Sequence, residues 1–228
     1  MKHFKLTTES KVNVFGVKLF RRECTIDFKY AKKGDLGGWV EKKDNLSGNA
    51  WVYGNAEVYG DAWVYGDAEV HGNAKVYGDA EVYGDAEVYG DAEVYGNAEV
   101  YGDAEVYGDA WVHGNAEVYG DAEVYGNARV HGNAKVYGNA KVYGDAWVYG
   151  NARVYGDAKV YGDAISTKKV YTLNFIHNLT LTDNHIRFGC IQKTIKEWVE
   201  WLDSDNVIET KRDTDRFKLI EMLSLIHI

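Results

Sequence analysis

The fold is decided by a six-residue unit that first reads GNAWVY at residues 48–53, then GNAEVY at 54–59 and GDAWVY at 60–65. The unit repeats without interruption from Gly48 to Tyr161, in 19 copies of the form Gly-[Asp/Asn]-Ala-x-Val-[Tyr/His]. The x position holds nine Glu, four Lys, four Trp and two Arg. A repeat this short and regular has to be interpreted before any other feature of the chain.

Each position of the unit has a structural meaning. Ala-x-Val-Tyr has a period of two, which predicts a strand with Ala and Val on one face and x and Tyr on the other. Gly followed by Asp or Asn predicts a corner, because both residue types suit turns. Three such sides close a triangular turn of 18 residues, and turns stack at about 4.8 Å. The array therefore predicts roughly six turns.

The chain also resembles a known family. The array is similar to the hexapeptide-repeat left-handed β-helix, and the left-handed winding is implied by that resemblance. GDLGGW at 34–39, the array, and FGCIQKTIKEW at 188–198 together resemble phage and prophage proteins that are described as transferases or polymer-forming proteins. We therefore expect a mainly β fold: a left-handed parallel β-helix, an N-terminal β cap and a small α+β C-terminal domain.

The domain boundaries follow from where the repeat begins and ends. Residues 1–47 are expected to cap the solenoid of residues 48–164, and residues 165–228 to form the C-terminal domain, as an end cap or oligomerisation unit. A phosphate loop is the alternative for residues 34–38, but no Lys-Ser/Thr follows it. The elements expected outside the array are strands at 12–20 (turned at Gly16), 170–175, 179–182 and 185–190, a tight turn at 34–40, and helices at 194–202 and 216–226.

Charge and composition exclude several classes of protein. Residues 48–125 carry one Lys and 17 Asp or Glu, a net charge of −16 within a chain of net charge −9. This argues against direct nucleic-acid binding, which requires Lys and Arg. There is no apolar run of 18 residues, no apolar leader and no disulfide framework. The composition thus predicts a cytoplasmic protein that does not enter membranes.

The 18-residue turn stacks residue i on residue i+18, so outward columns can be derived from the sequence alone. Two columns are rich in glutamate, and like charges stacked across strands are destabilising. They are either solvated faces, offset by the Lys residues at the column ends, or an acidic face for a basic protein partner. The glutamates are Glu69, Glu87, Glu105 and Glu123 in one column and Glu81, Glu99 and Glu117 in the other.

The third column differs, because Arg129 falls between two tryptophans and can form a cation–π sandwich. We interpret its surroundings as a candidate protein-contact patch, since Trp, Arg and Tyr dominate interface hot spots. Alternatively, His has replaced Tyr by drift. Metal binding by the two histidines lacks a third ligand, so no metal site is predicted. The patch consists of Trp111, His113, Arg129, His131, Trp147 and Tyr149.

Two further features have ordinary explanations. Asp67, Asp85, Asp103 and Asp121 form a corner column that suggests cation binding, but turn chemistry accounts for Asp there. Cys190 precedes an expected helix and could be a reactive thiol beside His177 or His185. A buried structural cysteine is the favoured interpretation.

The sequence therefore predicts a non-catalytic β-solenoid that binds a protein, in its narrowest form an acidic decoy for a host defence or nucleic-acid-binding protein. No cofactor is expected, and the protein is expected to form homo-oligomers. The alternative is an acyltransferase that uses coenzyme A, with His113 or His131 as general base. Such enzymes build their active sites on loops that interrupt the array, and here none interrupts it.

Overall fold

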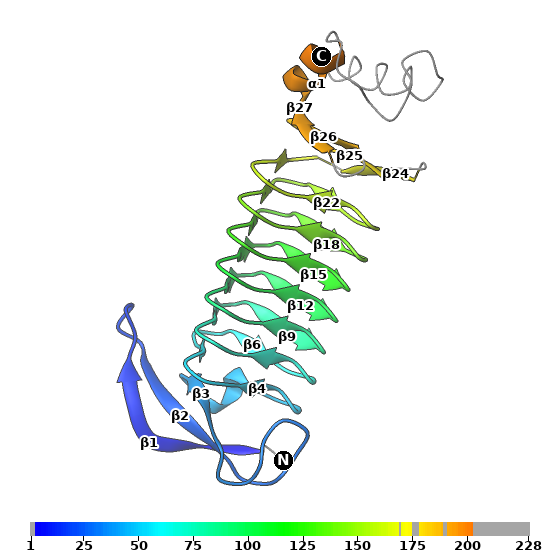
Figure 1. Cartoon of the computed structure of the whole chain (residues 1–228). Coiled ribbons are helices and arrows are strands. Elements are labelled where there is room, and N and C mark those ends of the chain that lie inside the picture. Colours follow the sequence, from blue (N-terminus) through cyan, green and yellow to red (C-terminus); the bar gives the residue numbers. More distant parts are fainter. Residues whose placement is uncertain (1–2, 169, 175–177, 189–190, 203–228) are drawn as a thin grey trace.

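The computed structural model of the chain describes residues 3–168, 170–174, 178–188 and 191–202. These residues form a straight rod, with a β-hairpin at the N-terminal end and a small sheet followed by one helix at the other end (Figure 1). The rod is a parallel β-solenoid with three sheets along its sides. The expected fold class is therefore confirmed.

Each sheet collects every third strand of the array, as the 18-residue turn requires. We call the three sheets I, II and III. The repeat strands of sheet I are β5 (Glu57–Val58), β8 (Lys75–Gly78), β11 (Glu93–Gly96), β14 (Trp111–Gly114), β17 (Arg129–Val130), β20 (Trp147–Val148) and β23 (Ile165–Ser166). Those of sheet II are β4 (Trp51–Val52), β7 (Glu69–Val70), β10 (Glu87–Val88), β13 (Glu105–Val106), β16 (Glu123–Val124), β19 (Lys141–Val142) and β22 (Lys159–Val160). Those of sheet III are β6 (Trp63–Val64), β9 (Glu81–Gly84), β12 (Glu99–Gly102), β15 (Glu117–Gly120), β18 (Lys135–Tyr137) and β21 (Arg153–Val154).

The register between turns is 18 residues throughout the array. Glu87 pairs with Glu105, and Tyr95 pairs with His113, in parallel ladders. The solenoid has about seven turns rather than the roughly six expected. The additional sides come from outside the 19 hexapeptides, because β23 extends sheet I after the last copy and β3 (Leu36–Val40) extends it before the first.

The core is a column of small apolar side chains. Every Val of the 19 repeats and every Ala from Ala56 to Ala164 is at most 1% exposed, whereas most x and aromatic residues are partly exposed. Ala and Val thus fill the interior, as the period of two predicts. Burying one Val contributes about 1.5–3 kcal/mol, so stability accumulates turn by turn.

The corners depend on glycine for two reasons. Gly84 has φ of +76°, in the left-handed region. A Cβ on Gly84 would also lie 2.9 Å from the backbone nitrogen of Gly102 in the next turn. Both conformation and close approach therefore exclude a side chain at this position.

The N-terminal residues form a three-stranded antiparallel extension of sheet I and a 3₁₀ turn. Its elements are β1 (Phe4–Val12), β2 (Lys18–Cys24), β3 and η1 (Lys43–Asn45). The strand expected at 12–20, turned at Gly16, is the turn of a hairpin: Gly16 (φ +79°) lies between the end of β1 at Val12 and the start of β2 at Lys18. The tight turn expected at 34–40 is largely strand β3. Its Gly37 and Gly38 lie against the first turn, where a Cβ on Gly38 would meet Ala56 O at 2.7 Å.

A buried arginine closes this end of the core. Arg22 is fully buried, donates two hydrogen bonds to Val52 O at 2.6 and 3.2 Å, and stacks over the Trp51 ring at 3.6 Å. Burial lowers the pKa of Arg22 well below its usual value. The guanidinium donates to a carbonyl that receives no amide from a preceding turn, so it acts as a cap.

The C-terminal elements are an antiparallel sheet and a helix. They are β24 (Tyr171–Asn174), β25 (Asn178–Leu181), β26 (His185–Phe188), β27 (Ile191–Thr194) and α1 (Ile195–Leu202). Strand β27 is an addition to the three expected strands. Helix α1 begins at a capping box, in which the Thr194 hydroxyl accepts from Glu197 N–H and the Glu197 carboxylate accepts from Thr194. The expected helix at 216–226, and Cys190 and His177, lie outside the described residues.

Paired glycine substitutions test the contribution of close approach. Gly16 has a similar φ to Gly84 but no atom within 4 Å of an added Cβ. Gly16→Ala should lose about 1–2 kcal/mol of unfolding free energy through the positive φ alone. Gly84→Ala should lose about 1–3 kcal/mol more, because adjacent turns must separate. Thermal unfolding followed by circular dichroism measures both, and equal losses would argue against the close stacking of turns.

Candidate functional site

The structure brings the six residues of the expected patch together on sheet I. The guanidinium carbon of Arg129 lies 4.7 Å from the centre of the Trp111 ring and 5.0 Å from that of Trp147. The two tryptophans are 36% and 42% exposed. The sandwich predicted from the column exists, and Arg129 fills the space between the two rings. The patch thus presents two tryptophan edges on either side of a fixed cation.

The two histidines are rungs of the aromatic ladder beside this sandwich. His113 stacks on His131 with ring centres 4.9 Å apart, and His131 stacks on Tyr149 at 5.0 Å. Tyr95 covers the other face of His113 at 4.7 Å. Burial, followed by the charge of Arg129, lowers the pKa of His131; burial, the neighbouring His131 and Arg129 lower that of His113.

This stacking bears on the acyltransferase alternative. A general base needs a ring nitrogen that reaches substrate. Neighbouring rings cover both faces of each histidine ring, but the ring nitrogens lie in the ring plane and are not covered by this stacking. The array supplies no loop beside them, because the hexapeptides follow one another without an insertion from Gly48 to Tyr161. The patch is therefore suited to surface contact.

The two predicted glutamate columns are present, and sequence reasoning missed what holds them. On sheets II and III, a tyrosine hydroxyl donates to the glutamate 16 residues later, in the next turn. Tyr89 donates to Glu105 at 2.7 Å, and Tyr83 donates to Glu99 at 3.0 Å. Burial, together with the acceptor carboxylate, raises the pKa of Tyr65 to about 12. The spacing of 16 residues between Tyr and Glu is the feature of the sequence from which these hydrogen bonds could have been predicted.

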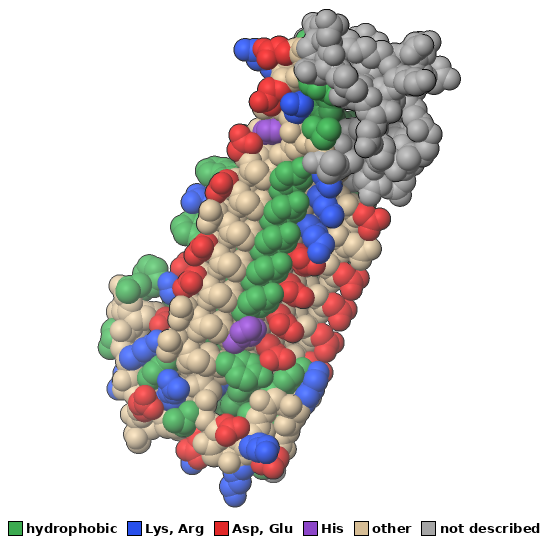
Figure 2. Space-filling view, viewed as in Figure 1, with side chains coloured by type: hydrophobic (Ala, Val, Ile, Leu, Met, Phe, Trp, Pro, Cys, Tyr) green, Lys and Arg blue, Asp and Glu red, His purple; other side chains and the backbone are tan. Residues whose placement is uncertain are grey.

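One corner carries a second acidic column next to the first. Asp67, Asp85, Asp103 and Asp121 precede the four stacked glutamates of sheet II by two residues each, and we call these eight residues the acidic edge: Asp67, Glu69, Asp85, Glu87, Asp103, Glu105, Asp121 and Glu123. Figure 2 shows the red carboxylates in columns beside the green ladder of aromatic rings. The two rows place eight carboxylates on four successive turns of this side of the rod.

Few basic side chains neutralise the acidic edge. Lys141 pairs with Glu123 at 2.5 Å, and Lys29 of the N-terminal region lies 4.0 and 3.8 Å from Asp67 and Asp85. His71 lies 3.8 Å from Glu87. Within the described part of the chain, four members make no ion pair: Glu69, Asp103, Glu105 and Asp121. No cluster of three or more metal-binding side chains occurs among the described residues.

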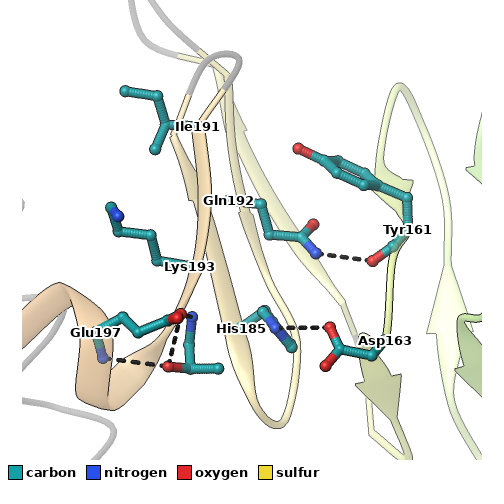
Figure 3. Close-up of a pocket in the computed structure, with 8 residues that line it drawn as sticks. Tyr161, Asp163, His185, Ile191, Gln192, Lys193 and Glu197 are labelled. Atoms are coloured by element: carbon teal, nitrogen blue, oxygen red, sulfur yellow. Dashed lines mark hydrogen bonds and ion pairs between the residues drawn. The ribbon is translucent and has the colours of Figure 1, made fainter.

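A pocket of about 560 Å³ lies where the last turn meets the C-terminal sheet (Figure 3). Buried His185 places Nε2 3.1 Å from a carboxylate oxygen of exposed Asp163. Gln192 donates to Tyr161 O at 2.7 Å, and Asn184 donates to Asp163 O at 3.2 Å. These bonds fasten the small sheet to the solenoid, so we interpret the pocket as the by-product of a polar clasp.

Comparison with known proteins supports the repeat architecture. A family model described as the YdcK beta solenoid repeat matches residues 134–150 and 146–162. No curated protein matches the sequence. The chain is therefore a β-solenoid repeat protein. No helix among the described residues is long and apolar enough to cross a membrane.

The histidine rungs predict a pH dependence. Because their folded-state pKa lies below the unfolded value near 6.5, the unfolded chain binds more protons, so stability should fall as the pH drops below about 6.5. His113→Tyr/His131→Tyr keeps the ladder and removes the titration. Its melting temperature should therefore fall less than that of the wild type between pH 7.5 and 5.5.

Tyr149→Phe is the matched control, because it changes the same ladder without removing a histidine. It should retain the wild-type pH dependence. Parallel pH profiles for the double variant and the wild type would show that the two histidines do not carry the effect.

Proposed function

We propose that this chain is a non-catalytic interaction protein whose acidic edge binds a basic surface of another protein. The observation that carries the proposal is the pair of adjacent carboxylate columns, four members of which make no ion pair within the described residues. A basic partner would supply the missing cations. Complementary charge of this kind also speeds association and selects the partner.

The electrostatic cost of the acidic edge supports this proposal. Two unit charges about 4–5 Å apart repel by about 1 kcal/mol even in bulk water. Glutamine at x could still accept the tyrosine hydroxyl through its side-chain oxygen, without this repulsion. The hydrogen bonds of the ladder therefore do not require glutamate. The presence of glutamate instead of glutamine at successive turns is better explained by binding to a basic partner.

The straight shape of the acidic edge indicates which kind of protein surface could bind it. The acidic edge is straight and uninterrupted over four turns, because each residue lies over its equivalent 18 positions earlier. A regular line of negative charge suits a basic groove that otherwise holds the backbone of a nucleic acid. The chain would then act as a decoy for a nucleic-acid-binding or host defence protein. The phage-type architecture implied by the sequence resemblance fits that role.

Charge-neutralised variants test this proposal. Glu69→Gln/Asp103→Asn/Glu105→Gln/Asp121→Asn removes the four carboxylates of the acidic edge that make no ion pair. Beads carrying the wild-type chain should capture basic proteins from a bacterial lysate at low salt, and DNA should compete with them. The variant should lose most of this capture, because the four carboxylates open to a partner's cations are neutralised.

The matched control neutralises four other corner carboxylates with the same change in net charge: Asp79→Asn/Asp91→Asn/Asp109→Asn/Asp145→Asn. It should capture the same proteins as the wild type. If the two variants behave alike, only net charge matters and the acidic edge is not a binding site. If the wild type captures no basic protein, the proposed function is wrong.

A further inference from the structure

Sheet III divides its charges between its two ends. Its outward x column reads Trp63, Glu81, Glu99, Glu117, Lys135 and Arg153 from the N-terminal to the C-terminal turn. Lys135 and Glu117 meet in the middle, with Nζ and Oε1 2.6 Å apart. Exposed Arg153 and half-buried Glu99, on either side of that pair, make no ion pair within the described residues. The column is therefore negative at one end and positive at the other.

Such a column is complementary to a reversed copy of itself. If two copies face each other with antiparallel solenoid axes, a two-fold axis parallel to the strands places each outward column opposite the same column of the second copy. Both columns have the same rise per turn, about 4.8 Å, so the match holds for the four turns from Glu99 to Arg153. When the two-fold axis lies between Glu117 and Lys135, Arg153 of each copy lies opposite Glu99 of the other. Lys135 of each copy then lies opposite Glu117 of the other.

The other relative orientation lacks this match. With parallel axes, the two-fold axis runs along the solenoid, and the charged column faces the tyrosine column of the second copy. The antiparallel arrangement instead places tyrosines opposite tyrosines. Tyr101, Tyr119 and Tyr137 form a regular stack on sheet III, with ring centres 4.8 and 4.9 Å apart. Stacked rings add apolar area to the contact, which exposed ion pairs alone would not hold.

The edge beside the charged column separates sheet III from sheet I, because Asn97 lies between β11 and β12. On sheet III that edge is a ladder of neutral amides, in which Asn97 donates to Asn115 at 3.0 Å and Asn115 donates to Asn133 at 3.1 Å. On sheet II the neighbouring edge is the aspartate column, and the equivalent register would place Asp103 opposite Asp157. Self-contact through sheet III therefore brings neutral amides together beside the charged column, whereas the aspartate column lies beside the tyrosines at the other border of sheet III.

We propose that two copies of this chain associate through sheet III with antiparallel axes, joined by Arg153 to Glu99 and Lys135 to Glu117 of the second copy. The inference goes beyond the proposed function, because it concerns self-association through sheet III, which borders the aspartates of the acidic edge but leaves its glutamates on sheet II uncovered. The dimer would carry two acidic edges. Exposed ion pairs are screened by salt, so the association should weaken as ionic strength rises.

Reciprocal charge reversal tests this arrangement. At low salt, sedimentation velocity should show a concentration-dependent dimer for the wild type. Lys135→Glu/Arg153→Glu should raise the dissociation constant about tenfold or more, and so should Glu99→Lys/Glu117→Lys, because each leaves like charges facing across the two-fold axis. Mixing the two variants should restore the dimer as a heterodimer. Circular dichroism checks that each variant is folded.

The matched control reverses the equivalent lysines of sheet II. Lys141→Glu/Lys159→Glu has the same change in net charge as Lys135→Glu/Arg153→Glu and should dimerise like the wild type. A wild-type monomer at 100 μM and low salt would overturn the proposal. So would a mixture of the two sheet III variants that stays monomeric, or a control that loses the dimer to the same extent.

Discussion

The structure depends on one constraint: the backbone of each turn bonds to the next turn 18 residues later. The amide of Glu105 donates to Ala122 O, and the amide of Glu123 donates to Ala140 O, at 2.9 Å in both cases. This places every side chain directly on the equivalent side chain of the neighbouring turn. A side-chain contact that contributes little in one hexapeptide is repeated along the whole rod, whether it is favourable or unfavourable. Valines stack into a core, tyrosines into ladders and glutamates into repulsive columns.

The same constraint shapes the surfaces available for recognition. Each face of this molecule is a set of parallel columns. A partner can therefore distinguish one turn from another only where a column changes residue type. Arg129 interrupts a pair of tryptophans on sheet I, and the glutamates of sheets II and III give way to Lys141 and Lys135 at the C-terminal turns. A binding partner is therefore expected to recognise whole columns and the turns at which they end. Single residues matter chiefly where they break the pattern.

Most of the array could be predicted from the sequence because its contacts are local and repeated. The inward Ala and Val, the 18-residue register and the sandwich of Arg129 all follow from counting positions. The tyrosine-to-glutamate bonds also follow from counting, at i, i+16, but they require side-chain reach to be considered. The ends could not be predicted in this way. Arg22 caps Val52 from 30 residues away, and no periodicity links the two.

The most direct test of the 18-residue register is a comparison of two labelled pairs. With Cys24 and Cys190 replaced by Ala, pyrene is attached to cysteines introduced at Glu87 and Glu105, or at Glu87 and Glu99. The first pair lies on adjacent turns of sheet II, and the second pair lies on different sheets. We predict strong excimer emission from the first pair and monomer emission from the second. Excimer emission from the second pair, or from neither, would contradict the stacking on which every column depends.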